Sequence, residues 1–119
     1  IISLLDIHAH NKPFKEYAVY NMAKAAHRMM VQSFALDMAP EVRVNGIAPG
    51  VNILPEADSD QALDPQQQKS IINSIPMQRI GKPEEIAHSV LYLAHARYVT
   101  GEIITVDGGR SLTLAGGHV

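Results

Sequence analysis

Three short, largely apolar runs separated by longer helical stretches constrain the fold of this chain most strongly. The runs cover residues 1–5, 41–48 and 102–106. Each connection between them is long enough for a right-handed crossover, which makes neighbouring strands parallel. With 46% hydrophobic and 18% charged residues among 119, the composition suits one globular unit. We therefore predict an α/β fold in which three parallel strands are joined by crossover helices.

Two long segments have the period of amphipathic helices. The first is predicted over residues 14–39, ended by Pro40, and the second begins at Pro83 with acidic residues in its first turn. A shorter helix is expected from Pro65 to about residue 74. The expected apolar positions of the first helix are Val19, Met22, Ala23, Ala26, Met29, Met30, Ser33, Phe34 and Met38. Those of the second are Ile86, Val90, Leu91, Leu93 and Ala94.

Charge and residue usage exclude several classes of function. A net charge of -2 provides no basic footprint for nucleic acid or for an anionic membrane surface. No apolar run approaches the about 20 residues that span a bilayer, so we expect a cytoplasmic protein. The chain has no cysteine, and His8 and His10 have no third ligand nearby in the sequence. We therefore expect no metal site.

Tyr20 and Lys24 are the first candidates for chemistry. Residues four apart share one face of a helix, so the phenol and the ammonium should point into the same cleft. A nearby cation favours tyrosinate and would lower the tyrosine pKa from roughly 10, toward a range that suits a general acid. The same pair is also common on solvated helix faces, so the spacing alone leaves both interpretations open.

Polar segments follow the first two predicted strands. Asp6 comes directly after the first strand, where open α/β sheets have their ligand crevice, although aspartate is also common in turns. Pro49 and Gly50 end the second strand, and residues 51–65 are irregular and acidic. Such a long segment is either a binding loop that closes over a ligand or a disordered loop.

The order of four motifs resembles that of the short-chain dehydrogenases/reductases. The motifs are Tyr20-x-x-x-Lys24, the run Arg43-Val44-Asn45-Gly46-Ile47-Ala48-Pro49-Gly50, the run Arg79-Ile80-Gly81-Lys82-Pro83-Glu84-Glu85-Ile86-Ala87, and Thr100-Gly101 followed by Val106-Asp107-Gly108-Gly109. Asp6, in place of the serine usual in the family, and the run from Asp107 through Arg110 to Leu112 resemble the pteridine reductase branch.

The resemblance implies hydride transfer from NADPH to a pteridine or dihydrofolate-type ring. It makes Tyr20 the proton donor, through Asp6 or a water, and Lys24 the residue that holds the nicotinamide ribose. Pro49, Gly50 and Asn52 would border the nicotinamide. Asp6 precedes Tyr20 by fourteen residues where the family pattern has thirteen, so the intervening loop must absorb one extra residue.

The Gly-rich turn that receives a dinucleotide pyrophosphate is missing from the pattern. Gly108-Gly109 and Gly116-Gly117 are expected to open no helix, and the Gly-rich segment 110–119 to end in a flexible tail. We therefore expect residues 1–119 to be one partial Rossmann-type domain, the carboxyl-terminal half of a doubly wound reductase, and to be inactive alone. Its exposed edge and apolar helix should favour a homo-oligomer.

Two other functions stay open at this stage. One is a ketoreductase of the 3-oxoacyl carrier-protein type, which the missing serine opposes. The other is a non-catalytic half-domain that only folds or associates.

Overall fold

Three parallel strands form a single sheet in the order β1, β2, β3. The computed structural model describes residues 1–9, 12–54, 56, 58–60 and 62–114. The strands are β1 (Ile2–Leu4), β2 (Asn45–Pro49) and β3 (Ile103–Val106). The predicted α/β class and parallel sheet are therefore confirmed.

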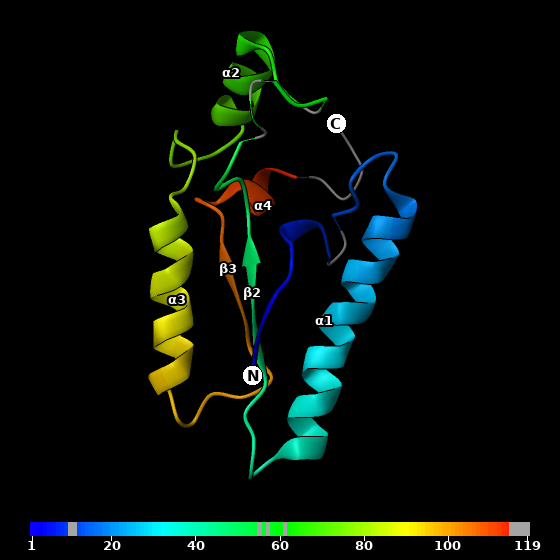
Figure 1. The fold of residues 1–119 in the computed structure, drawn as a ribbon, viewed down its shortest axis with the longest axis vertical. Helices are drawn as coiled ribbons and strands as arrows, with labels where there is room; N and C mark the ends of the chain where they lie inside the picture. Colours follow the sequence, from blue (N-terminus) through cyan, green and yellow to red (C-terminus); the bar gives the residue numbers. More distant parts are fainter. Residues whose placement is uncertain (10–11, 55, 57, 61, 115–119) are drawn as a thin grey trace.

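Two long helices sandwich the sheet. Figure 1 shows α1 (Ala18–Met38) on one side of the strands and α3 (Pro83–His95) on the other. The remaining helices lie toward the carboxyl ends of the strands: η1 (Ile7–Ala9), α2 (Pro65–Asn73) and α4 (Arg110–Thr113). Asp64 caps α2 by accepting a hydrogen bond from the backbone N–H of Gln67, whose side chain bonds the Asp64 N–H in return.

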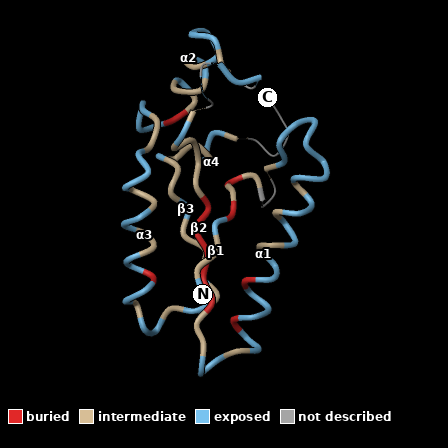
Figure 2. Tube along the Cα trace, viewed as in Figure 1, coloured by how far each residue is buried: buried red, intermediate tan, exposed pale blue. Residues whose placement is uncertain are grey.

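The core lies along β2, as Figure 2 shows by the concentration of buried residues there. On the α1 side, Ala48 packs in one cluster with Val31 and Ala35 of the helix. Side chains of successive strand residues point to opposite faces, so Ile47 faces the α3 side, where Leu93 is also fully buried. The buried residues of α1 and of α3 therefore lie on the two opposite faces of β2.

The second strand is shorter than predicted at its start. Residues 41–44 lie outside the strand, since the register with β1 and β3 begins at Asn45 and Gly46, although the Val44 carbonyl still accepts a 2.8 Å hydrogen bond from the Gly101 N–H. Arg43 instead donates hydrogen bonds to four backbone carbonyls at the end of α3 and in the turn after it. A residue expected in a strand thus fixes the end of a helix.

Helix α1 begins four residues later than predicted. Glu16 has a positive φ of 71°, which interrupts a helical path, and Tyr17 N–H closes a turn onto the Phe14 carbonyl. The Asn21 side chain holds this turn by bonding both the N–H and the carbonyl of Phe14. The chain therefore enters the helix immediately before Tyr20.

The buried faces of both helices differ from the expected ones. In α1 only Val31 and Ala35 are buried, whereas most of the expected apolar residues are exposed, including Val19 at 76% and Met22 at 63%. In α3 Leu93 is buried, but Leu91 is 57% exposed. Three strands are too narrow a sheet to cover the whole apolar surface of either helix.

The expectation that Gly108-Gly109 opens no helix was wrong. Gly109, with φ of 89°, is the residue from which α4 begins, so the Gly108-Gly109 pair does open a short helix. The Asp107 carboxylate holds that helix by accepting hydrogen bonds from the N–H groups of Gly109 and Ser111, at 2.9 and 2.7 Å. Residues 115–119, with Gly116 and Gly117, lie outside the described residues.

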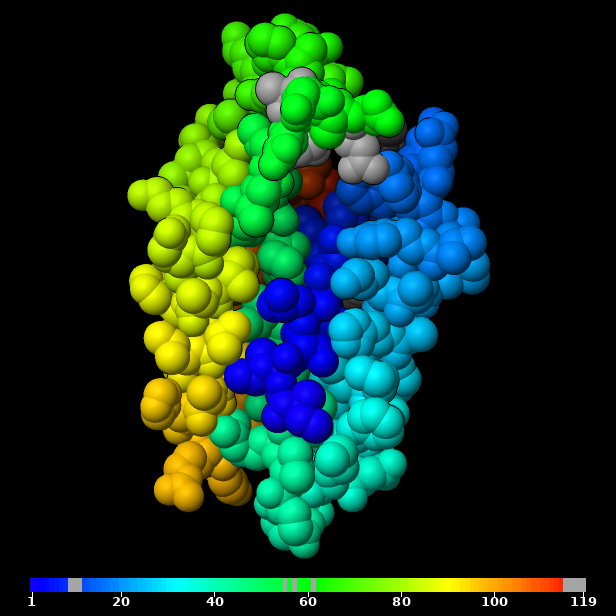
Figure 3. Space-filling view, in the orientation of Figure 1, coloured from blue at the N-terminus to red at the C-terminus, as the bar shows by residue number. Residues whose placement is uncertain are grey.

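Strand β1 is an edge of the sheet and lies at the surface. Figure 3 shows the amino-terminal residues running over the visible face between α1 and α3. Ile1 and Leu4 are 62% and 53% exposed. All three strands run in the same direction, so the segments after β1, β2 and β3 gather at one end of the sheet, where the candidate site lies.

Candidate functional site

The phenol of Tyr20 and the carboxylate of Asp6 meet at the carboxyl end of β1. Tyr20 Oη donates a hydrogen bond of 2.7 Å to Asp6 Oδ2. The other oxygen, Asp6 Oδ1, accepts a hydrogen bond of 2.8 Å from the backbone N–H of His8, at the start of η1. The carboxylate is thus oriented by the backbone on one side and bound by the phenol on the other.

The loop between these two residues absorbs the unusual spacing of fourteen residues. It turns first through η1 and then through the turn that Phe14 and Tyr17 close. The rings of His8, Phe14, Tyr17 and Tyr20 pack in sequence, with neighbouring centroids 4.5, 4.9 and 6.2 Å apart. This aromatic row stabilises the loop against the start of α1.

Lys24 lies one turn after Tyr20 on the same face of α1. Its Nζ atom is 5.9 Å from the centroid of the Tyr20 ring and donates one long hydrogen bond of 3.4 Å to the Leu4 carbonyl. A half-buried ammonium with a single weak hydrogen bond keeps donors available for a ligand. The spacing of four residues therefore places the two side chains together, as predicted from helix geometry.

The pKa of Tyr20 moves in the opposite direction from the sequence-based expectation. Burial, followed by the hydrogen bond to Asp6 and its negative charge, raises the pKa of Tyr20 to about 12. These causes stabilise the neutral phenol, and the Lys24 ammonium, 5.9 Å from the ring centroid, does not outweigh them. At neutral pH the phenol is therefore protonated and directs its proton at Asp6.

The three residues expected beside a nicotinamide lie at and just after the end of β2. Pro49 pairs with Val106 across the sheet, and the Gly50 N–H continues the ladder with a 3.0 Å hydrogen bond to the Val106 carbonyl. A Cβ on Gly50 would lie 2.7 Å from the Cβ of Asp107, so this close approach of the two strand ends requires glycine.

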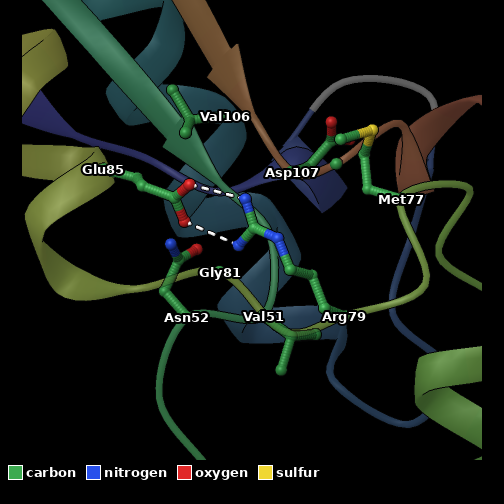
Figure 4. Close-up of a pocket in the computed structure, with 9 residues that line it drawn as sticks. Val51, Asn52, Met77, Arg79, Gly81, Glu85, Val106 and Asp107 are labelled. Carbon is green, nitrogen blue, oxygen red and sulfur yellow. Dashed lines mark hydrogen bonds and ion pairs between the residues drawn. The ribbon is translucent and has the colours of Figure 1, made fainter.

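Asn52 lies apart from the tyrosine and lysine, in a separate cavity of about 180 Å³. Its Nδ2 donates a hydrogen bond of 3.3 Å to the Lys82 carbonyl. Figure 4 shows this side chain beside Gly81 and the paired side chains of Arg79 and Glu85. Asp6 lines a different cavity, of about 280 Å³. The predicted site residues thus fall into two groups, one with Asp6 and the tyrosine and lysine of α1, the other with Asn52.

Two features of this end of the sheet were missed. Arg79 Nη1 and Nη2 contact the two oxygens of Glu85 at 3.0 and 2.7 Å, a bidentate ion pair. Arg110 is half-buried, and burial lowers its pKa although the charges of Asp6 and Asp107 oppose the change. Both arginines were noted only as parts of motifs, and no local spacing indicates their partners.

No group of three metal-ligating side chains occurs among the residues that the structure describes. His8 Nδ1 is hydrogen-bonded to the Lys12 carbonyl at 2.8 Å, and His10 lies outside the described residues. In the same described ranges, no helix is both long and apolar enough to cross a membrane.

Comparison with known proteins identifies the class to which this fold and site belong. A family model described as enoyl-(acyl carrier protein) reductase matches residues 1–111. The chain belongs to this family, within the short-chain dehydrogenase/reductase superfamily.

Individual relatives have several different activities in their names. Pteridine reductase 1 of Leishmania tarentolae is 35% identical over 97% of this chain and 39% of its own length. A granaticin polyketide synthase ketoacyl reductase of Streptomyces violaceoruber is 33% identical over 87% of this chain and 41% of its own. The chain thus spans about two fifths of these relatives.

A solved structure has the same fold. The short-chain dehydrogenase/reductase named glucose/ribitol dehydrogenase from Brucella melitensis superposes with a TM-score of 0.77 and 30% sequence identity. The match covers 92% of this chain and 42% of that structure. Together the relatives identify an oxidoreductase family and leave its substrate to be argued from the site.

Proposed function

We propose that the protein containing this chain is an NADPH-dependent reductase of a pteridine or dihydrofolate-type ring. The observation that carries the proposal is the 2.7 Å hydrogen bond from Tyr20 Oη to Asp6 Oδ2. A carboxylate held beside a protonated phenol suits a substrate with ring N–H groups and basic ring nitrogens. The 35% identity to a protein named pteridine reductase supports the same substrate class.

Tyr20 and Asp6 would act as a proton relay. With its pKa raised to about 12, the Tyr20 phenol holds its proton at neutral pH, and the 2.7 Å hydrogen bond directs that proton to Asp6. The Asp6 carboxylate would pass the proton that Tyr20 Oη gives to Asp6 Oδ2 on to a ring nitrogen of the substrate, which leaves Tyr20 as tyrosinate and Asp6 as a carboxylate again. The His8 N–H keeps the carboxylate in the orientation that this exchange requires.

The described residues fit a nicotinamide cofactor. When bound, NADPH supplies the hydride, and the protein orients it. Lys24, with its single 3.4 Å hydrogen bond, would hold the ribose hydroxyls. Pro49, Gly50 and Asn52 would border the nicotinamide, and Asn52 Oδ1 accepts no hydrogen bond from the described residues, which leaves an acceptor for a carboxamide.

A ketoreductase is the second candidate. Its support is the ketoacyl reductase relative and the 39% exposure of Tyr20, which lets the phenol reach a carbonyl oxygen directly. Against it, Ser3 lies within β1 and no serine follows that strand at the position of Asp6.

We propose that the 119-residue chain alone is inactive. Within the described residues, the one helix that begins after a glycine pair is α4, whose first N–H groups already bind the Asp107 carboxylate. That negative charge would repel a pyrophosphate. On this proposal the described residues would supply the catalytic pair and no site for the phosphates.

We also propose that the protein forms a homo-oligomer through the exposed apolar face of α1. Val19, Met22 and Met29 are each at least 60% exposed on this one helix. Sedimentation at tens of micromolar, an order of magnitude that detects weak pairing, should show a species larger than the monomer. A strictly monomeric species would contradict this proposal.

Turnover by the complete natural protein tests the function. NADPH oxidation is measured with a dihydropterin and, separately, with a 3-oxoacyl thioester. We expect turnover of the pterin, a loss of about a hundredfold or more in Tyr20→Phe, and little change in Tyr17→Phe, a neighbouring ring of the same aromatic row. Turnover of the thioester alone would establish the ketoreductase instead.

A further inference from the structure

The Arg79–Glu85 ion pair lies at the centre of a small network between β2 and α3. Glu85 Oε2 accepts hydrogen bonds from Arg79 Nη1 at 3.0 Å and from the Lys82 N–H at 2.7 Å. Glu85 Oε1 accepts the second bond of the pair, at 2.7 Å, from Arg79 Nη2. One carboxylate therefore joins the connector before α3 to the first turn of that helix, as Figure 4 shows for the ion pair.

The connector in turn holds the loop after β2. The Gly81 N–H donates a hydrogen bond of 2.9 Å to the Val51 carbonyl. The Asn52 amide donates to the Lys82 carbonyl at 3.3 Å. Gly81 is also packed so closely against Asn52 that a Cβ at this position would overlap the Asn52 amide. The position of Asn52 thus depends on the path of residues 79–82.

We propose that Arg79 and Glu85 are positioning residues that hold Asn52 where it contacts the nicotinamide end of the cofactor. The inference rests on the proposed function, because it takes Asn52 to border that ring. The pair lines the same cavity as Asn52 and would act on Asn52 through Gly81 and Lys82. Its contribution is therefore to cofactor affinity, and the proton relay of Tyr20 and Asp6 is independent of it.

The ion pair is too exposed to act mainly by stabilising the fold. The Arg79 side chain is 48% exposed and that of Glu85 is 35% exposed. Pairs with this exposure contribute little to folding stability. Its geometry is nevertheless specific, because two parallel hydrogen bonds fix the orientation of both groups. If the ion pair acts by positioning Asn52, its loss should change the affinity for the cofactor, so NADPH binding is the quantity to measure.

The test is Glu85→Gln in the complete protein, with Glu84→Gln as the matched control. Glu84 is the neighbouring acid in the same first turn of α3 and has no hydrogen bond or ion pair among those of the described residues. We expect Glu85→Gln to weaken NADPH binding by roughly threefold to tenfold, measured by cofactor fluorescence, with kcat changed less than about twofold. Glu84→Gln should bind as the unaltered protein does.

A double-mutant cycle identifies Asn52 as the group that is positioned. Glu85→Gln made in an Asn52→Ala background should cause no further loss of affinity, because the receiving side chain is already gone. Gly81→Ala, which leaves the ion pair intact and displaces Asn52, should weaken NADPH binding by itself. Equal losses of affinity from Glu85→Gln in both backgrounds would overturn the proposal.

Amide hydrogen exchange tests the positioning step without the cofactor. The Gly81 N–H, bonded to Val51, should exchange several-fold faster in Glu85→Gln and at an unchanged rate in Glu84→Gln. Unchanged exchange in Glu85→Gln would refute the inference even if NADPH binds. Conversely, an unaltered protein that does not bind NADPH would refute the proposed function, while faster Gly81 exchange would still support the link from Glu85 to this loop.

Discussion

Replacing Asp6 with asparagine should lower the pKa of Tyr20 and leave it above its ordinary value. The substitution preserves the shape of the side chain and an oxygen that can accept from the phenol, but it removes the negative charge. In the native site the pKa of Tyr20 rises from 10.0 to about 12, with burial as the largest cause and the hydrogen bond and charge of Asp6 next. Burial persists in Asp6→Asn, so we expect a value between these two limits.

The raised pKa of Tyr20 makes the stability of the folded protein depend on pH. A raised folded-state pKa means that the folded protein holds its phenol proton more tightly than the unfolded chain does. The corresponding stability is fully present below pH 10.0 and is lost as pH rises toward about 12. In Asp6→Asn this loss should be complete at a lower pH.

The assay is the ultraviolet absorbance of tyrosinate during a pH titration. The chain has four tyrosines, so the Tyr20 step is isolated by subtracting the titration of Tyr20→Phe from that of each parent protein. A Tyr20 pKa at or below 10.0 in the native chain would refute the reasoning. So would a higher pKa in Asp6→Asn than in the native chain, because removing a negative charge cannot favour the neutral phenol.

Three further predictions concern the fold and its electrostatics. Leu93→Ala should lower the free energy of unfolding by about 2–5 kcal/mol in urea denaturation, since Leu93 is fully buried, whereas Leu91→Ala on the exposed side of α3 should change it little. Arg43→Met should cost about 1–3 kcal/mol by leaving carbonyls at the end of α3 without donors, and an unchanged urea midpoint would contradict that role. The Arg79 guanidinium, followed by the Lys82 N–H, lowers the pKa of Glu85 from 4.5 to about 2. Any stability from Glu85 is therefore present above pH 4.5 and lost as pH falls toward 2, so the urea midpoints of the native chain and Glu85→Gln should converge at acid pH.

The elements that depend on local sequence were predicted well. The three apolar runs became parallel strands, and Pro83 with its acidic neighbours marks the start of α3. Tyr20 and Lys24 share a helix face because their spacing in the helix dictates it. These features depend on periodicity, capping and chain stiffness. Each of these acts over a few residues and can therefore be predicted from the sequence.

Only the tertiary structure decided which groups meet. The bond from Tyr20 to Asp6 depends on the path of η1 and the turn before α1, and it reversed the expected direction of the Tyr20 pKa. Likewise, Val31 is buried in α1 while Met22 is exposed, because the width of the sheet selects which part of an apolar helix is covered. The sequence by itself determined the strands, the long helices and the Tyr20–Lys24 spacing, since those follow from short-range backbone preferences. The carboxylate beside the phenol and the burial that sets its charge state come from residues distant in the chain, whose approach no local pattern encodes.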